Sequence, residues 1–377
     1  MIPFNKPSIV GKELEYIQDA FGNGKTCGDG KYSKLCHQFL QEKFGAPKVL
    51  LTTSGTHALE MAALLLDIQP GDEVIMPSYT FVSTVNAFVL RGAKPVFCEI
   101  REDDLNMDPD HVESLVSPKS RAIVPVHYAG IGCEMERILE IAKKSNLFVV
   151  EDAAQGVNAK YRGSFLGTIG HIGCFSFHET KNFSMGEGGA ILLNDESFRE
   201  RAEIIREKGT NRSKFFRGLV DKYTWVDVGS SFLPSDILAA VLWAQLEKMD
   251  SIQKKREQIF DKYMDGLGEL EKQGFVRLPK IPSHISCNSH MFYFLARTGK
   301  ERNELIEFLR DRKVYSVFHY IPLHESPFFQ EKFGKVSLPK TENLSRRLLR
   351  LPLYYSLDLK DVEMVIQCIR EYFGSMN

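Results

Sequence analysis

The stretch FVVEDAAQ, residues 148–155, is a short apolar run that ends in acid. A second apolar run begins CFSFHETKN, at residues 174–182, and it is followed at once by the glycine-rich segment GEGG at residues 186–189. Short apolar runs bounded by polar and glycine residues are typical of buried β-strands. Asp152 and Lys181 are therefore both expected where a strand ends.

Outward from these runs, the chain between about residues 48 and 194 alternates β-branched runs with runs of helical period. The candidate strands are residues 48–53, 73–77, 95–100, 122–127, 147–152, 173–178 and 189–194. The candidate helices are residues 56–66, 80–91, 109–116 and 134–145. This alternation predicts an α/β fold, in which a mostly parallel sheet carries helices on both faces. Ligands of such sheets bind along the edge where the loops before the helices lie, and Asp152 and Lys181 fall at that edge.

The C-terminal third of the chain has a different pattern. A long helical pattern follows Pro234, and beyond it we expect a smaller α+β unit. Its predicted elements are a helix at residues 302–312, a strand at 314–320 and a terminal helix at 359–373. The basic stretch SRRLLRL, residues 345–351, has the spacing of an amphipathic helix surface. The sequence thus predicts a large domain at residues 1–249 and a small C-terminal domain at residues 250–377.

Composition excludes several classes of protein. The 377 residues carry a formal net charge of −1, so the chain lacks the basic excess of proteins that bind nucleic acids or anionic membranes. Its 7 cysteines are scattered and never spaced as CxxC, which argues against disulfide and zinc frameworks. No apolar run reaches the ~18 residues of a membrane span, and the first residues do not resemble a signal peptide. We therefore expect a soluble cytoplasmic protein.

A lysine and an aspartate at neighbouring strand ends are what a pyridoxal phosphate enzyme needs. The Lys181 amine can hold the cofactor aldehyde as a Schiff base, and Asp152 can keep the pyridine nitrogen protonated so that the ring accepts a carbanion's electrons. Gln155 can reach back over the same loop to the cofactor. Singly, each residue has a plainer interpretation: a solvated lysine, an aspartate that caps a helix, and a glutamine on a helix surface. Only the combination indicates the chemistry.

The phosphate of such a cofactor needs an anion site, and TTSGTHAL, residues 52–59, offers one. Gly55 and Thr56 lie in a small turn between a strand and a helix, where free N–H groups and the positive helix end attract anions. Ser176 can add a second hydroxyl. Phe81 follows the next strand, where it can stack on the pyridine ring or, alternatively, pack into the core.

Several histidines need a separate interpretation. His319 and His324 flank Tyr320 in the segment HYIPLH, and these three side chains either face the substrate or have a structural role. His127 ends a candidate strand and either lines the pocket or is structural. The histidines show no recognised spacing for metal ligands, so the sequence predicts no metal site.

These elements together resemble the DegT/DnrJ/EryC1/StrS sugar aminotransferases, which have the aspartate aminotransferase fold (pyridoxal phosphate fold type I). The resemblance covers essentially the whole chain, and the matching motifs lie at residues 54–56, 151–155, 176–182 and 186–189. By position it implies that Lys181 binds the cofactor and carries protons, and that Asp152 contacts the ring nitrogen. It also implies Gln155 on the hydroxyl side of the ring, Phe81 stacked on the ring, and Gly55, Thr56 and Ser176 on the phosphate.

The resemblance further implies a ping-pong transamination in which L-glutamate gives its amine and leaves as 2-oxoglutarate. The amine then passes to the C4 ketone of TDP-4-oxo-6-deoxy-D-glucose, giving TDP-4-amino-4,6-dideoxy-D-galactose. This narrower likeness is carried by residues 72–82, 167–182 and 204–212. Alternatives are another C4 stereochemistry, C3 regiochemistry or another ketosugar, and, from a different class, a cofactor-binding regulator without turnover. Similar proteins are homodimers with active sites at the subunit interface, and the same is expected here.

Overall fold

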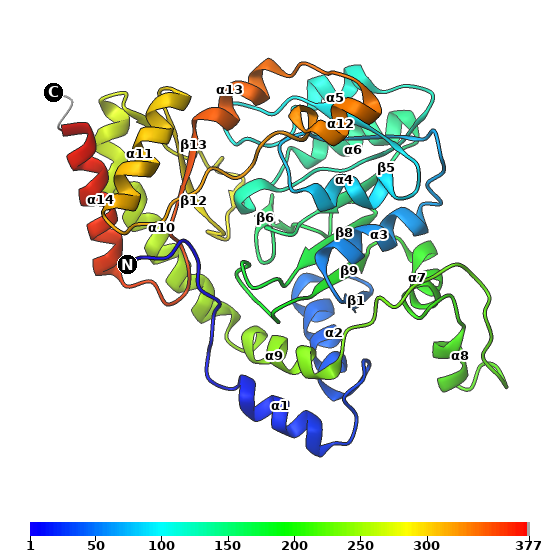
Figure 1. Cartoon of the computed structure of the whole chain (residues 1–377). Coiled ribbons are helices and arrows are strands. Elements are labelled where there is room, and N and C mark those ends of the chain that lie inside the picture. The colour runs from blue at the N-terminus through cyan, green and yellow to red at the C-terminus, as the bar shows by residue number, and fades with distance from the viewer. Residues whose placement is uncertain (375–377) are drawn as a thin grey trace.

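A seven-stranded sheet lies at the centre of the protein, for which a computed structural model describes residues 1–374 (Figure 1). In spatial order its strands are β1 (Val49–Thr52), β9 (Gly189–Leu193), β8 (Ile172–Ser176), β5 (Phe148–Asp152), β4 (Ser120–Ile123), β2 (Glu73–Pro77) and β3 (Lys94–Cys98). Neighbouring strands pair in parallel, except that β9 is antiparallel to both β1 and β8. The mostly parallel α/β sheet that the sequence predicts is confirmed.

Helices cover both faces of this sheet. Successive side chains of each strand point to opposite faces, and both faces are buried in a hydrophobic core. One face packs against α2 (Lys31–Phe44), α6 (Met135–Ser145) and α9 (Asp236–Leu246), and the other against α3 (Gly55–Leu65), α4 (Val82–Val89) and α7 (Arg199–Arg206). In β8, for example, Phe175 joins the first core and Cys174 the second. With both faces covered, the loops at the strand ends are left to carry the site.

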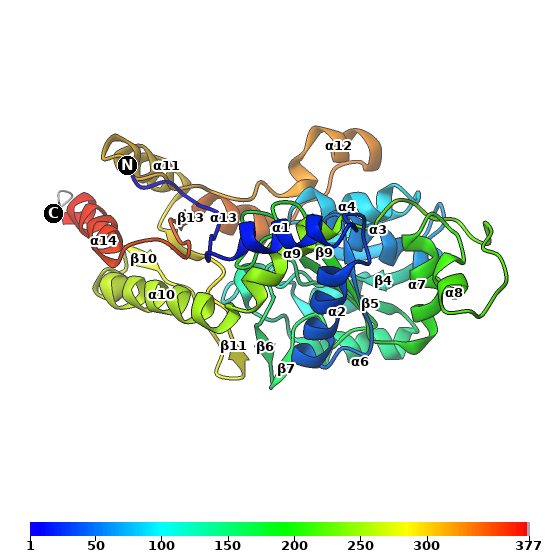
Figure 2. The same ribbon diagram turned by 90° about the horizontal axis from the view of Figure 1, so that it is seen from below.

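A third core joins the C-terminal part of the chain to the start of the chain. Strands β10 (Val276–Arg277), β12 (Phe292–Ala296) and β13 (Leu348–Leu351) form a small antiparallel sheet against α10 (Met249–Lys272), α11 (Gly299–Asp311) and α14 (Leu359–Gly374). Figure 2 shows this unit beside the large sheet. Ile2 packs into the same core and donates its N–H to Lys313 O at 2.8 Å. The domain boundary after residue 249 stays a prediction.

The remaining elements are peripheral. The helices are α1 (Glu13–Gly22), α5 (Pro109–Leu115), α8 (Arg212–Phe216), α12 (Pro327–Phe333) and α13 (Pro339–Arg347), and the strands β6 (Lys160–Tyr161), β7 (Ser164–Phe165) and β11 (Ile285–Ser286) form a second small sheet. Across residues 1–374, every helix is too short or too polar to cross a membrane.

Three sequence expectations for the C-terminal part are wrong. The single long helix after Pro234 is two helices, α9 and α10, which meet at residues 247–248. The expected strand at residues 314–320 forms only two isolated bridges, from Val314 to Ile2 and from Val317 to Arg350. The expected surface helix at residues 345–351 ends with α13, and the fully buried strand β13 follows.

The reasons for these errors are physical. One apolar face serves both α9 and α10, because Leu246 and Ile252 enter the same core, so periodicity does not reveal the turn between the helices. The segment 314–320 leaves the small sheet and crosses towards the large one, so it lacks neighbouring strands over most of its length. In β13 the run of leucines is buried on both sides, and the basic spacing around it is coincidental.

Candidate active site

Four chain segments meet at one edge of the large sheet. Strand β5 ends there at Asp152 and β8 at Ser176, while α3 begins at Gly55 just after β1. Helix α4 begins shortly after the end of β2, and the turn from β8 to β9 contains Lys181. Parallel strands end at the same edge of a sheet, and the direction of the strands therefore brings together side chains that are far apart in sequence.

Asp152 is held in a fixed orientation at the end of β5. The residue is only 6% exposed. Its Oδ2 accepts a hydrogen bond from the Thr84 hydroxyl at 2.7 Å. Oδ1 accepts from the backbone N–H of Ala154 at 3.1 Å. No basic side chain of the described residues forms a salt bridge with this carboxylate. Since a carboxylate has about four acceptor sites, the two hydrogen bonds leave others free. Asp152 therefore keeps the capacity to accept a hydrogen bond from a cationic ring nitrogen.

Lys181 lies in the turn after β8, where its N–H donates to His178 O at 2.9 Å. Within residues 1–374 its ammonium group has neither a hydrogen bond nor a salt bridge. Burial lowers the pKa of Lys181 to about 8, Asp152 opposes this shift, and Arg350 adds to it. A neutral amine at moderate pH is a nucleophile, so the site prepares this lysine to attack a carbonyl.

The N-terminus of α3 forms an anion site. Ser54 caps the helix by accepting from the N–H of His57 at 3.0 Å, which leaves the N–H groups of Gly55 and Thr56 without a partner among the described residues. The Thr56 hydroxyl bonds the Ser83 hydroxyl at 2.7 Å. A Cβ on Gly55 would lie 2.9 Å from the Cβ of Ser176, so only glycine lets the two chain segments approach this closely.

Tyr320 brings the C-terminal part of the chain to this edge. Burial raises the pKa of Tyr320, whereas the charge of Arg350 and hydrogen bonding to Gln155 and Arg350 lower it. The Gln155 Oε1 accepts from the N–H of Ala129 at 2.7 Å. Phe81 is 55% exposed, and its ring centroid lies 6.0 Å from that of Tyr320. The structure thus places Gln155, Phe81 and Tyr320 beside one another.

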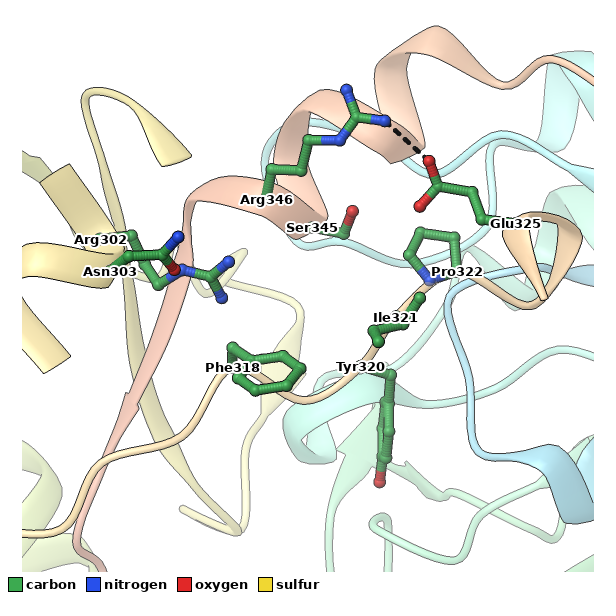
Figure 3. Close-up of a pocket in the computed structure, with 9 residues that line it drawn as sticks. All are labelled: Arg302, Asn303, Phe318, Tyr320, Ile321, Pro322, Glu325, Ser345 and Arg346. Carbon is green, nitrogen blue, oxygen red and sulfur yellow. Dashed lines mark hydrogen bonds and ion pairs between the residues drawn. The ribbon is translucent and has the colours of Figure 1, made fainter. Parts of the chain in front are cut away.

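A cavity of about 270 Å³ lies next to Tyr320, between α11 and α13 (Figure 3). The figure shows the Tyr320 ring directed away from Ser345 and Arg346, which line the opposite part of the cavity. Arg346 pairs there with Glu325 at 2.7 Å. The segment around Tyr320 therefore separates this cavity from the edge where Asp152 lies.

The histidines have unequal positions. His319 is exposed, and its Nδ1 lies 3.4 Å from an Arg350 nitrogen. His324 is only 2% exposed and its ring nitrogens contact Ser78 at 2.7 Å and Glu342 at 3.3 Å, so the structure gives it a structural place rather than one facing a substrate. His127 is likewise buried, with Nε2 2.9 Å from Glu151, and does not line the pocket.

Sequence reasoning missed four residues that the structure brings to this edge. The Thr84 hydroxyl bonds Asp152, and the Ser83 hydroxyl bonds Thr56. The signal in the sequence was the pair Thr80 and Thr84, four positions apart in the helix expected at residues 80–91. His290 Nδ1 lies 2.9 Å from Oδ1 of Asn182, the residue after Lys181, and burial, followed by the charge of Lys181, lowers the pKa of His290. Arg350 had no such signal, since its strand was expected to be a surface helix.

The whole chain matches known sugar aminotransferases. The model of the DegT/DnrJ/EryC1/StrS aminotransferase family matches residues 7–370. The chain belongs to this family. It is 32% identical to the GDP-perosamine synthase of Escherichia coli O157:H7 over 374 residues, which cover 99% of each chain. The aminotransferase TlmJ of Streptoalloteichus hindustanus has a similar structure, with a TM-score of 0.92, 28% identity and 100% of both chains covered.

Members of the DegT family depend on pyridoxal phosphate, and this protein is such a sugar aminotransferase. Spr1654 of Streptococcus pneumoniae, with structures in a PLP form and a PMP form, has a TM-score of 0.92 and 25% identity to this chain; the PLP form is covered to 99% and this chain to 100%. The residues at the sheet edge fit that cofactor, because an unpaired amine, a buried carboxylate and a helix N-terminus match its aldehyde, ring nitrogen and phosphate.

Proposed function

We propose that the protein transfers an amino group from L-glutamate to the C4 ketone of TDP-4-oxo-6-deoxy-D-glucose. The products would be 2-oxoglutarate and TDP-4-amino-4,6-dideoxy-D-galactose. The observation that carries the proposal is the meeting of Lys181, which has a low pKa and no partner among residues 1–374, with Asp152 at one sheet edge. Membership of the aminotransferase family favours an enzyme over a cofactor-binding regulator without turnover.

Bound pyridoxal phosphate supplies an electron sink for the carbon that loses a proton. Lys181 Nζ would take that proton and deliver it to the carbon on the other side of the transferred nitrogen, acting first as a general base and then as a general acid. Asp152 would keep a proton on the ring nitrogen, and the Thr84 hydroxyl would fix the orientation of the carboxylate. Each role uses a contact or a charge that the side chain already has.

The other predicted residues would bind and orient. Gly55, Thr56 and Ser176 hold the phosphate at the start of α3, where free N–H groups and hydroxyls converge. Gln155 binds the hydroxyl side of the ring, and Phe81 stacks on the ring. Because His319 and Tyr320 enter from the C-terminal part of the chain, we assign them to the substrate side of the cleft, without His324.

The identity of the sugar rests on likeness of sequence. Residues 72–82, 167–182 and 204–212 resemble the TDP-4-oxo-6-deoxy-D-glucose transaminase of enterobacterial common antigen synthesis. None of the three relatives named above has this substrate in its name. A related nucleotide-sugar aminotransferase with another C4 stereochemistry, C3 regiochemistry or ketosugar is therefore the second candidate.

We also propose that two copies assemble with their active sites at the interface. The segment after α7 carries exposed apolar side chains, among them Trp225 at 78% exposed, with Phe216 and Leu219 nearby in sequence. Exposed apolar groups of this size mark interaction sites. Light scattering should give twice the monomer mass, and a Trp225→Ser, Phe216→Ser variant should shift towards the monomer. A monomeric wild-type protein would contradict the assembly.

The test of the proposed function is analysis of the product. The protein, pyridoxal phosphate and L-glutamate are incubated with TDP-4-oxo-6-deoxy-D-glucose, and the aminosugar is identified by NMR. An axial amine at C4 supports the proposal, and an equatorial amine moves the enzyme to the second candidate. If wild-type protein forms 2-oxoglutarate from L-glutamate but no aminosugar, the proposed sugar is wrong while the transaminase chemistry stands.

A further inference from the structure

The segment at residues 318–321 reaches the candidate active site with little support from its own backbone. Before it lies the isolated bridge between Val317 and Arg350, and after it the N–H of Leu323 donates to Ser78 O at 2.9 Å. Between these two points, the segment forms no hydrogen bond between backbone groups within the described part of the chain. Other contacts must therefore hold the segment in place.

Two buried tyrosines approach this segment from neighbouring strands of the large sheet. Tyr79 follows β2 and Tyr128 follows β4, which pairs with β2 in parallel. Parallel strands end at the same edge of a sheet, so both side chains start from the edge where Asp152 lies. Each tyrosine is only 1% exposed, and their hydroxyl oxygens lie 3.3 Å apart. The sheet thus brings two phenol hydroxyls to one point.

Both hydroxyls donate to the same backbone oxygen. The distance to His319 O is 2.7 Å from Tyr79 Oη and 3.0 Å from Tyr128 Oη. A carbonyl oxygen has two lone pairs and can accept both hydrogen bonds. Burial raises the pKa of both phenols, that of Tyr128 to about 12, so both hydroxyls keep their protons at the pH of an enzyme assay. The large-sheet side therefore holds the His319 carbonyl with two donors.

The two tyrosines are themselves fixed by other contacts. Tyr128 donates its backbone N–H to Asn106 Oδ1 at 2.9 Å, and its ring centroid lies 5.9 Å from that of Tyr293. The Tyr79 ring packs edge-on against the ring of Tyr320, with centroids 6.2 Å apart. Loss of a hydroxyl would therefore release the segment at residues 318–321 and leave the phenyl rings packed as before.

We propose that Tyr79 and Tyr128 are positioning residues, whose hydroxyls fix the His319 carbonyl and thereby set where the side chains of His319 and Tyr320 meet the ketosugar; this rests on the proposed function. Both hydroxyls are directed at the backbone of the segment, so the tyrosines act through it. Because the carbonyl is the group that is held, the two side chains stay available to the substrate. A displaced binding residue weakens ground state and transition state alike, so KM should change more than kcat.

Tyr293 supplies a matched control. It belongs to the same group of buried tyrosines and is 2% exposed, but its hydroxyl has no hydrogen-bond partner within residues 1–374. Removal of this hydroxyl changes the same buried region without removing a contact to the segment at residues 318–321. If Tyr79 and Tyr128 only contributed to the core, their phenylalanine variants would behave like Tyr293→Phe.

The test compares Tyr79→Phe, Tyr128→Phe, the double variant and the control Tyr293→Phe with wild-type holoenzyme. Tyr79→Phe and Tyr128→Phe should each raise KM for TDP-4-oxo-6-deoxy-D-glucose by about 3-fold, because each removes one of the two hydrogen bonds. The double variant should raise this KM by about 10-fold or more, and kcat should change by less than about 3-fold throughout. Tyr293→Phe should leave KM unchanged.

Amide hydrogen exchange gives a readout independent of turnover. The N–H groups of Val317 and Leu323 are hydrogen-bonded at the two ends of the segment, so peptides that contain them report its opening. Their exchange should be about 3-fold faster in each single variant at residues 79 and 128, about 10-fold faster in the double variant, and unchanged in Tyr293→Phe.

Two outcomes would overturn the positioning role. One is an unchanged ketosugar KM in both Tyr79→Phe and Tyr128→Phe, and the other is exchange at the segment that rises equally in Tyr293→Phe. Wild-type protein that does not aminate the ketosugar would instead refute the proposed function. The exchange rates would then still decide whether the two hydroxyls hold the segment.

Discussion

The two sides of the candidate active site are built in different ways. On the large-sheet side, Gly55, Asp152 and Lys181 each lie within a few residues of a strand end, so local sequence places them. On the other side, Tyr320 follows a segment that pairs with its neighbours only through isolated bridges, and Arg350 lies on the short strand β13. Under the proposed function, the first side would bind the cofactor and move the proton, and the second would face the substrates. The comparison shows that local sequence places the residues at the strand ends, whereas contacts between distant segments place Tyr320 and Arg350.

The largest expected effect is on the chemistry side. Lys181→Ala should lower kcat by at least about 10³-fold, because the variant loses both the nucleophilic amine and the proton carrier. Formation of 2-oxoglutarate measures the rate, and thermal unfolding should show an unchanged Tm. The exposed lysine variant Lys143→Ala should keep wild-type activity. Substantial turnover by Lys181→Ala would show that another residue supplies the amine, and would contradict the role given to the large-sheet side.

A smaller loss is expected from Asp152→Asn, about 10²- to 10³-fold in kcat, because a neutral amide no longer stabilises charge on the ring nitrogen. Thr84→Val removes only the hydroxyl that orients the carboxylate, so about a 10-fold loss is expected. Steady-state kinetics at saturating cofactor measure both variants. A Thr84→Val loss as large as that of Asp152→Asn would show that orientation, and not charge, is the main contribution of the pair.

The pH dependence of cofactor attachment tests the electrostatics that link the two sides. Because burial lowers the pKa of Lys181 to about 8, the neutral amine should predominate above that pH. The rate of attachment of pyridoxal phosphate to the apoprotein should therefore rise about 10-fold from pH 7 to pH 9 and then level off. Stopped-flow absorbance follows the attachment. A rate that still rises steeply beyond pH 10 would show an ordinary lysine pKa.

Substitutions at the two neighbours of Lys181 should move this profile in opposite directions. Arg350 lowers the pKa of Lys181, so Arg350→Gln should shift the midpoint to higher pH. Asp152 raises the same pKa, so Asp152→Asn should shift the midpoint to lower pH. Shifts of the same sign in both variants would mean that the two charges do not act on the amine directly.

The same comparison explains how much of the fold and of the candidate site could be predicted from the sequence. The sheet, its flanking helices and the positions of Asp152, Lys181 and the start of α3 follow from local period and turn residues. The surroundings of Arg350 could not be predicted, because its burial depends on pairing with β12, which lies far away in sequence. The sequence left open whether His324 faces the substrate or is structural, and the structure buries its ring. Which side chain faces a cleft is decided by tertiary packing.

The smallest expected effect on catalysis is that of substituting His324, which is compared with the exposed His319 of the same segment. His324→Ala should lower the free energy of unfolding by about 1–3 kcal/mol, because the Ser78 hydroxyl loses its buried partner, and leave KM for the ketosugar unchanged. His319→Ala should leave stability unchanged and raise that KM, since the ring lies exposed beside Arg350. Urea unfolding and steady-state kinetics on both variants measure the four quantities. A raised KM in stable His324→Ala would return that histidine to the substrate side, whereas an unaltered KM in His319→Ala would remove His319 from it.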